Sequence, residues 1–207
     1  MLTNQQKNNA PIFIVFEGID GSGKSTQAKM LSAQFTNKNI PHILKKEPGD
    51  TPIGEKIREL LSADSDIGSL TELFLFSAAR KELMDKEIVP ALGNNISIIL
   101  DRYIYSTIAY QGYGRNLDFE RITQINNIAT NGLQPDIVFL LDIDPTESSH
   151  RMNSTLLDRI ESEPIEFYDK VRNGYLSIAQ KTPSMWIILD ASKSPSDINS
   201  QIWEYLR

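Results

Sequence analysis

The residues best suited to chemistry lie together near the start of the chain, between positions 18 and 25. They read Gly-Ile-Asp-Gly-Ser-Gly-Lys-Ser, in which Gly18, Gly23, Lys24 and Ser25 have the spacing of a phosphate-binding loop. In such a loop, backbone N–H groups and the positive end of the following helix hold phosphates. The lysine reaches the terminal phosphates and the hydroxyl binds Mg²⁺, whereas a plain tight turn would need neither residue. The pattern therefore predicts a binding site for a nucleoside triphosphate.

We expect every residue of this loop to contact the triphosphate. The expected triphosphate-binding residues are Gly18, Ile19, Asp20, Gly21, Ser22, Gly23, Lys24, Ser25 and Thr26.

A second group of polar residues follows a short apolar run at positions 96–100. Asp101 comes directly after this run, where a buried parallel strand would end at the ligand-binding edge of its sheet. A carboxylate there can hold Mg²⁺, because this hard cation prefers oxygen ligands, so Ser25 and Asp101 are the predicted metal-binding residues. Arg102 would point away from Asp101 in an extended segment and could bind a second anion, although an ordinary surface ion pair would leave the same pattern.

Three arginine and aromatic residues could form a site for a second nucleotide. Phe76 and Arg80 are four residues apart in a long amphipathic segment, so both would project from one face of a helix. Such a pair can stack on a nucleobase and bond its edge, although by pattern alone Phe74 and Phe76 in an apolar helix are more often core residues. Arg58 could pair with a monophosphate, and on spacing alone it is equally a solvated surface charge.

These residues must be positioned by an α/β fold, because strand patterns and helix patterns alternate along the chain. We expect strands at residues 12–17, 41–46, 96–100, 137–143 and 185–189, and helices at 24–35, 52–61, 70–92, 104–111, 118–130, 145–152, 165–180 and 195–206. The alternation predicts an α/β sheet of five parallel strands flanked by helices on both faces, and the phosphate-binding loop makes it a P-loop NTPase-type fold. Residues 11–207 are expected to form a single domain after a polar, disordered tail at residues 1–10.

The composition excludes several classes of function. The net charge of −6 disfavours non-specific binding to DNA or RNA, so we expect no nucleic acid partner. The chain has no cysteine, and therefore neither disulfide bonds nor thiolate metal sites. No apolar run approaches the ~20 residues of a membrane span and no signal-peptide pattern is present, so we expect a cytoplasmic protein with no membrane partner.

Several motifs, taken together, resemble those of thymidylate kinases over about residues 12–205. They are Phe-Glu-Gly-Ile-Asp-Gly-Ser-Gly-Lys-Ser-Thr at 16–26, Glu-Pro-Gly-Asp-Thr at 47–51, Phe-Ser-Ala-Ala-Arg at 76–80, Asp-Arg-Tyr at 101–103, Ser-Thr-Ile-Ala-Tyr-Gln-Gly at 106–112, Pro-Asp at 135–136 and Asp-Arg-Ile-Glu at 158–161. The phosphate-binding loop is common to many folds, but the other motifs are specific as a set. The resemblance implies a homodimeric enzyme of dTTP synthesis that uses Mg²⁺ and transfers the γ-phosphoryl group of ATP to dTMP, giving dTDP.

The resemblance also implies roles for the residues of the acceptor site. Asp20 would contact the deoxyribose 3′-hydroxyl, Phe76 would stack on thymine and Arg80 would reach the O4 edge of the base. Arg58 and Arg102 would hold the dTMP phosphate. The full set of expected dTMP-binding residues is Asp20, Glu47, Pro48, Arg58, Phe76, Arg80, Arg102, Ser106, Thr107, Tyr110 and Gln111.

The segment near residues 150–160 is the expected lid over the transferring phosphate, and it departs from the family pattern. Family members without an arginine in the phosphate-binding loop usually carry several in this lid. Here the loop has Gly21 and Ser22, and Asn153 stands near a position where arginine is expected, so two lid arginines remain. Positioning and charge neutralisation suffice for phosphoryl transfer to an anionic phosphate oxygen, without a general base. The expected catalytic residues are therefore Lys24, Arg102, Arg151 and Arg159.

Two other functions fit the sequence less well. A kinase for UMP, CMP or a deoxynucleoside could share the fold, although a nucleoside acceptor would need a carboxylate base and would leave Arg58 and Arg102 without an anion. A nucleotide-binding module with little catalysis would fit the arginine-poor lid. A GTPase is disfavoured, because the guanine motif Asn-Lys-x-Asp is absent. For a dTMP kinase, we expect dUMP to be a slower substrate and dCMP to be rejected more strongly.

Overall fold

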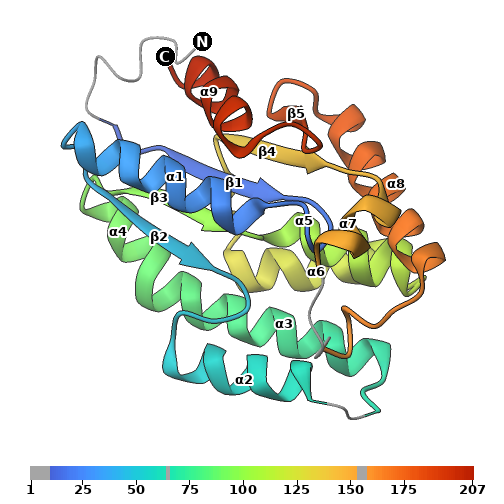
Figure 1. Cartoon of the computed structure of the whole chain (residues 1–207). Coiled ribbons are helices and arrows are strands. Elements are labelled where there is room, and N and C mark those ends of the chain that lie inside the picture. The colour runs from blue at the N-terminus through green and yellow to red at the C-terminus, as the bar shows by residue number, and fades with distance from the viewer. Residues whose placement is uncertain (1–9, 64–65, 153–157) are drawn as a thin grey trace.

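The computed structural model describes residues 10–63, 66–152 and 158–207. Its centre is a sheet of five parallel strands in the order β2-β3-β1-β4-β5 (Figure 1). The strands are β1 (Phe13–Glu17), β2 (His42–Lys46), β3 (Ser97–Asp101), β4 (Ile137–Asp142) and β5 (Trp186–Asp190). Each begins and ends within one residue of its predicted position, and the predicted sheet is confirmed. The predicted tail, apart from Ala10, and residues 153–157 of the predicted lid lie outside the described residues.

The two central strands bring the predicted chemistry to one edge of the sheet. β1 and β3 are buried along their whole length, as expected for parallel strands that are covered on both faces. Phe16 of β1 pairs with Asp101 of β3, so the phosphate-binding loop and Asp101 leave the sheet side by side. This carboxyl edge is where open parallel sheets bind their ligands.

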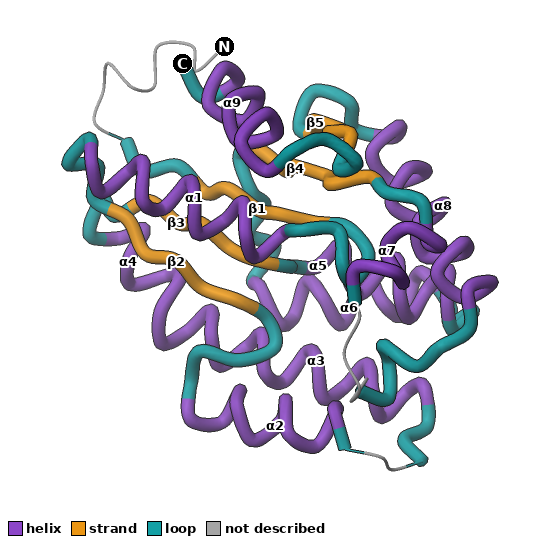
Figure 2. The backbone as a smooth tube through the Cα atoms, viewed as in Figure 1, coloured by secondary structure: helices purple, strands orange, loops and turns teal. Residues whose placement is uncertain are grey.

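Helices cover both faces of the sheet (Figures 1 and 2). On one face α1 (Lys24–Asn37) packs against α9 (Pro195–Tyr205), and on the other lie α4 (Val89–Gly93), α5 (Ile104–Thr107) and α8 (Ile165–Lys181). The remaining helices are α2 (Pro52–Ser62), α3 (Ser69–Leu83), α6 (Phe119–Thr130) and α7 (Pro145–Arg151). None of the described helices is both long enough and apolar enough to cross a membrane.

Two of the predicted helices contain π-helical segments. The helix predicted at 70–92 consists of α3, the π-helical segment η2 (Met84–Ile88) and α4. Pro90 gives a reason, because proline has no N–H and its ring would clash with the carbonyl of the preceding turn. The helix predicted at 104–111 is α5 followed by the π-helical segment η3 (Ile108–Gly114). Such widened turns often occur at functional sites, and η3 carries Tyr110 and Gln111.

The main hydrophobic core surrounds the sheet, and a smaller one extends it. Val15, Leu100 and Leu140 are among the buried residues of the main core. A separate cluster of Ile57, Leu61 and Ala79 joins α2 to α3. These two helices form an arm beside the sheet (Figure 1). The small core joins them to each other, while α3 also packs against α6 and adds Leu83 to the main core.

Candidate active site

The phosphate-binding loop connects β1 to α1 at the carboxyl edge of the sheet. Gly18 has a φ of 144°, and a Cβ atom there would lie 2.6 Å from the Leu141 carbonyl oxygen, so the tight turn requires glycine. Gly23 caps α1 without a side-chain hydrogen bond. The first N–H groups of α1 are therefore available to an anion, as expected for a phosphate site.

Lys24 is the buried cation of this loop. Its Nζ donates a hydrogen bond to the Ile19 carbonyl oxygen at 2.8 Å, so the ammonium points back into the curl of the loop. Burial, together with the positive charge of Arg102, lowers the pKa of Lys24 to about 8, although Asp20 and Asp101 favour the charged form. The ammonium is thus held where phosphate oxygens would meet the backbone N–H groups.

Ser25 and Asp101, the predicted metal-binding residues, are in contact. The Ser25 hydroxyl donates to Asp101 Oδ2 at 2.5 Å, while Asp101 Oδ1 is buried without a hydrogen-bond partner among the described residues. A buried carboxylate oxygen with no donor suits a cation or its water ligands. The described residues contain no cluster of three or more His, Cys, Asp or Glu side chains that could hold a metal. This donor set fits Mg²⁺, which is usually bound by one or two protein oxygens together with substrate phosphates.

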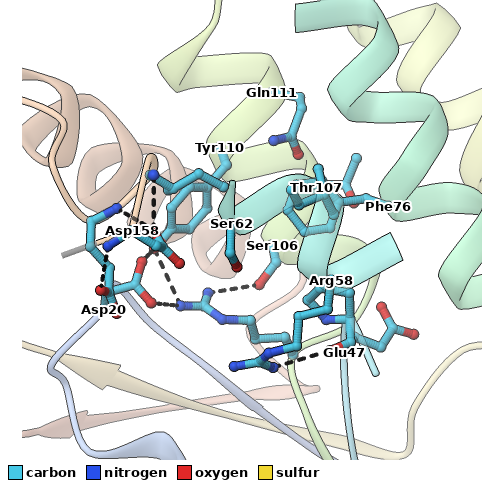
Figure 3. A pocket seen from close by; sticks show the side chains of 15 residues that line it. Asp20, Glu47, Arg58, Ser62, Phe76, Ser106, Thr107, Tyr110, Gln111 and Asp158 are labelled. Atoms are coloured by element: carbon cyan, nitrogen blue, oxygen red, sulfur yellow. Dashed lines mark hydrogen bonds and ion pairs between the residues drawn. The ribbon is translucent and has the colours of Figure 1, made fainter. Parts of the chain in front are cut away.

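A pocket opens between Asp20 and the α2–α3 arm (Figure 3). It is lined by Asp20, Glu47, Pro48, Arg58, Leu61, Ser62, Phe76, Arg102, Ser106, Thr107, Tyr110, Gln111, Asp158, Ile160 and Glu161. The structure therefore brings ten of the eleven predicted dTMP-binding residues into one pocket, and Arg80 is the exception. Phe76 lines the pocket and also packs on the core of the arm, whereas Phe74 is 53% exposed and is not a core residue.

Arg102 joins this pocket to the phosphate-binding loop. Its guanidinium forms an ion pair with Asp20 and donates to the Gly18 carbonyl oxygen and to Ser106 Oγ, each at 3.2 Å. Tyr110 donates to the other Asp20 oxygen at 2.7 Å. Burial would raise the pKa of Asp20, but Arg102 and Lys24 outweigh it and the pKa is lowered. Arg102 thus pairs with the loop rather than with its neighbour Asp101, and the alternative of an ordinary surface pair is wrong.

Arg80 supports the wall of the pocket from behind. It is 2% exposed, and its Nε donates to Glu47 Oε2 at 2.8 Å. Its Nη1 donates to Thr107 Oγ1 and Asn126 Oδ1, and its Nη2 donates to the Tyr103 carbonyl oxygen. With five N–H groups on a guanidinium, at most one remains for a ligand. Arg80 is therefore not among the residues that line the pocket, and its expected contact with the base edge stays a prediction for the one remaining N–H. Its buried acceptors come from other segments, which helical spacing does not reveal.

Arg58, by contrast, lies on the open side of the pocket. It is exposed, and its Nη1 donates to the Pro48 carbonyl oxygen at 3.1 Å. The side chain therefore lines the pocket and is also solvated, and its pairing with a monophosphate stays a prediction.

The two lid arginines lie at different places, and the structure does not bring them together. Arg151 borders a second pocket, lined by Gly21, Ser22, Gly23, Thr26, Gln27, Leu141, Arg151, Ala191, Lys193, Pro195 and Ile198, and donates to the Ala191 carbonyl oxygen at 2.9 Å. Arg159 pairs instead with Glu72 of α3 at 2.5 Å. Neither guanidinium faces the position between the pockets in this structure, so their shared catalytic role stays a prediction.

Position 21 of the loop has no room for a replacement arginine. Gly21 has a φ of 74°, and a Cβ atom there would lie 2.7 Å from the Ser148 carbonyl oxygen. Because that oxygen belongs to the backbone of α7, a side chain at position 21 would require α7 to shift. The absence of an arginine from position 21 is therefore a consequence of how the loop packs against α7.

Two buried carboxylates of the site were missed by the sequence analysis. Glu17 is fully buried and accepts hydrogen bonds from the Tyr103 N–H, the Ser106 hydroxyl and the Tyr175 hydroxyl at 2.6 to 2.9 Å. Burial raises its pKa. The other is Glu72 of α3, which is buried and accepts a hydrogen bond from Gln111. The signal for Glu17 was available, because a charged residue in an otherwise apolar strand must find partners.

Comparison with known proteins agrees with a phosphate-binding loop beside a second nucleotide pocket. A family model described as thymidylate kinase matches residues 16–202. The thymidylate kinase of Chlorobaculum parvum is 44% identical, with 95% of each chain covered, and that of Prosthecochloris aestuarii is 45% identical, with 93% of this chain and 92% of that protein covered. The crystal structure of thymidylate kinase from Ehrlichia chaffeensis aligns with a TM-score of 0.80 and 34% identity over 96% of this chain and 100% of that one. The chain therefore belongs to the thymidylate kinase family.

Proposed function

We propose that this thymidylate kinase, which phosphorylates dTMP to dTDP with ATP, holds its two nucleotides in the two pockets that flank the phosphate-binding loop. One observation carries the proposal: Asp20 lines the pocket of Phe76 and Arg102, while the next residues, Gly21 to Gly23, line the pocket of Arg151. Adjacent residues of one loop thus face both pockets. Two nucleotides placed there would meet with their phosphates at the loop.

In this arrangement dTMP occupies the pocket of Phe76, and its phosphate lies between Arg58 and Arg102. Arg102 is held by Asp20, Ser106 and the Gly18 carbonyl oxygen, so its guanidinium is positioned before the substrate arrives. Lys24 lies on the other side of the loop and would exchange its bond to the Ile19 carbonyl oxygen for the ATP phosphates. The transferring group would thus be flanked by two cations, which is the main demand of phosphoryl transfer.

Ser25 and Asp101 would hold Mg²⁺ on the donor side. The bound ion supplies positive charge to the phosphate oxygens of ATP. The chain's own contribution is the hydroxyl of Ser25 and the unpartnered Oδ1 of Asp101.

A panel of acceptors tests the reaction and the site together. With ATP and Mg²⁺, we expect the highest kcat/KM for dTMP, a lower value for dUMP, and far lower values for dCMP, UMP and thymidine. Phe76→Leu should raise KM for dTMP by about tenfold and leave KM for ATP unchanged, because the ring faces only the acceptor pocket. Phe74→Leu is the matched control on the same helix and should change neither. Faster turnover of thymidine or UMP than of dTMP would overturn the proposal.

We also propose that the enzyme is a homodimer in the cytoplasm. The outward stripe of α3 consists of Leu70, Phe74 and Ala78, which are exposed at the spacing of one helix face, with Leu70 42% and Phe74 53% exposed. A second copy of the chain would cover this apolar stripe. Light scattering should give twice the mass of the chain, and Phe74→Glu should give a monomer; a monomeric native protein would contradict the dimer.

A further inference from the structure

We propose that Glu72 is a specificity-determining residue: it fixes the orientation of the Gln111 side-chain amide, so that an acceptor oxygen faces the substrate base. The inference rests on the proposed function in one respect, namely that the pocket of Phe76 receives the acceptor base. Glu72 itself does not line that pocket and acts through Gln111.

The contact between the two side chains is buried. Glu72 of α3 is 1% exposed and Gln111 of η3 is 2% exposed, and Gln111 Nε2 donates to Glu72 Oε1 at 2.7 Å. An ionised carboxylate can only accept hydrogen bonds, so the amide nitrogen must face Glu72. Gln111 Oε1 then points the other way and has no partner within the described part of the chain. Figure 3 shows the Gln111 amide directed toward Phe76 and Thr107, which also line the pocket.

Two arginines keep Glu72 ionised in its buried place. Arg115 donates to it through Nε and Nη2, each at 3.3 Å, and Arg159 Nη2 donates at 2.5 Å. Burial would raise the pKa of Glu72, but the hydrogen bonds from Gln111, Arg115 and Arg159 outweigh burial and lower it. Glu72 therefore stays an acceptor at neutral pH, and the Gln111 amide has one favourable orientation.

An acceptor oxygen at the base edge discriminates between pyrimidines. Thymine and uracil carry a proton on N3 and can donate to Gln111 Oε1, whereas N3 of cytosine is an acceptor and would face another acceptor. An unpaired or opposed polar group in a buried site is costly, so cytosine is rejected. Arg80, which the resemblance placed at the O4 edge, does not line the pocket and is engaged by Glu47, Thr107 and Asn126. Gln111, oriented by Glu72, would supply the acceptor oxygen at the base edge.

The test compares acceptors on a single variant, Glu72→Gln, which has the same shape but a side chain that can also donate. Gln111 can then turn its amide over, and the ratio of kcat/KM for dTMP to kcat/KM for dCMP should fall by about tenfold or more. A role limited to structure would lower both values together and leave the ratio unchanged. Glu163→Gln is the matched control, because it removes the other carboxylate partner of Arg115 and leaves the contact between Glu72 and Gln111 in place; its ratio should match the wild type.

Two further variants complete the test. Glu72→Asp keeps an acceptor-only group, so the ratio should stay within about twofold of the wild type even if both rates fall. If Glu72→Gln does not fold, Gln111→Met removes the oxygen directly, and the ratio should again fall by about tenfold. An unchanged ratio in a folded Glu72→Gln enzyme, or in Gln111→Met, overturns the inference. A wild-type enzyme that did not prefer dTMP over dCMP would instead contradict the proposed function.

Discussion

The two sides of the phosphate-binding loop offer a nucleotide different kinds of contact. On the donor side, the loop and the start of α1 present backbone N–H groups, and Lys24 is held by a carbonyl oxygen of the same loop. On the acceptor side, Arg102 is fixed by side chains from separate elements, namely Asp20, Ser106 and Tyr110. In the proposed arrangement, the phosphate-binding part of the donor site is thus a local product of about eight consecutive residues, although distant segments also line the donor pocket. The whole acceptor site depends on contacts between distant segments.

Buried carboxylates account for much of this difference. Glu17, Glu47 and Glu72 each lie behind the acceptor pocket or at its wall, and each accepts hydrogen bonds from residues of another element. A buried carboxylate is stable only with such partners, and in return it fixes their orientation. The acceptor half is therefore held by hydrogen bonds between elements before substrate binds, whereas in the proposed arrangement Lys24 would give up a bond to its own loop. Substitutions on the two sides should reveal this contrast.

The largest effect is expected on the donor side, from Lys24→Met. The variant removes a buried cation that would face the transferring phosphates, so kcat/KM should fall by about 10³-fold or more. Release of ADP in a coupled assay measures it. Lys29→Met, on an exposed turn of the same helix, removes the same charge and should leave the rate unchanged. Equal losses in the two variants would mean that only the overall charge matters.

On the acceptor side, Arg102→Lys tests whether the planar guanidinium group of Arg102, with its several N–H donors, is needed. Lysine keeps the charge but cannot bond Gly18, Ser106 and Asp20 at once, so kcat/KM for dTMP should fall by about 10²-fold, mostly through kcat. Arg58→Lys changes an exposed arginine with one hydrogen bond to the Pro48 carbonyl oxygen, and should raise KM for dTMP by less than about tenfold. A larger loss at Arg58 than at Arg102 would reverse the order of importance.

Arg151 and Arg159 separate the two sides further, with smaller effects. Arg151 borders the donor pocket, so Arg151→Ala should raise KM for ATP by about tenfold and leave KM for dTMP unchanged. Arg159 bonds Glu72 and the Leu61 carbonyl oxygen beside the acceptor pocket, so Arg159→Ala should affect dTMP instead. If each variant keeps kcat within about twofold of the wild type, neither arginine is catalytic.

The contrast between the two sides also explains what the sequence could predict. The strands and the phosphate-binding loop were predictable, because apolar runs and the spacing of Gly18, Gly23 and Lys24 are local signals. The composition of the acceptor pocket came from the resemblance of motifs. The burial of Arg80 could not be predicted, because its partners Glu47 and Asn126 lie 33 and 46 residues away in the sequence.

Glu72 and the lid show the same limit in other ways. Glu72 has the spacing of an ordinary first-turn helix residue, and its burial depends on Gln111, Arg115 and Arg159 arriving from later elements. The separation of Arg151 from Arg159 depends on how α7 docks against the loop, through the contact of Ser148 with the Asp20 carbonyl oxygen. Spacing along a chain does not report such contacts between distant segments.

The smallest expected effect is the uptake of a proton when a nucleotide binds, and we expect it on the donor side alone. In the free enzyme, burial and Arg102 lower the pKa of Lys24 from 10.5 to about 8, so much of its charge is lost by about pH 8.5. Phosphates beside the ammonium would raise its pKa again. ADP binding at about pH 8.5 should therefore take up more than half a proton, and ADP affinity should fall by up to about tenfold per pH unit above 8. Titration calorimetry in buffers of different ionisation enthalpy measures the uptake, and it should vanish in Lys24→Met.

The same pKa sets the sign of a stability change that needs no ligand. Because the pKa of Lys24 is lower in the folded enzyme than in the unfolded chain, the unfolded chain binds more protons between about pH 8 and 10.5. Below about pH 8, burial of the charged ammonium lowers the free energy of unfolding by its full amount. As pH rises through this window, Lys24 loses its proton in the folded enzyme, so the free energy of unfolding increases. Lys24→Met should remove that increase, which urea unfolding at several pH values detects.

dTMP binding on the acceptor side should take up no such proton, because Arg102 stays charged and its pKa is raised by Asp20. Proton uptake with dTMP equal to that with ADP would mean that Lys24 serves both nucleotides alike.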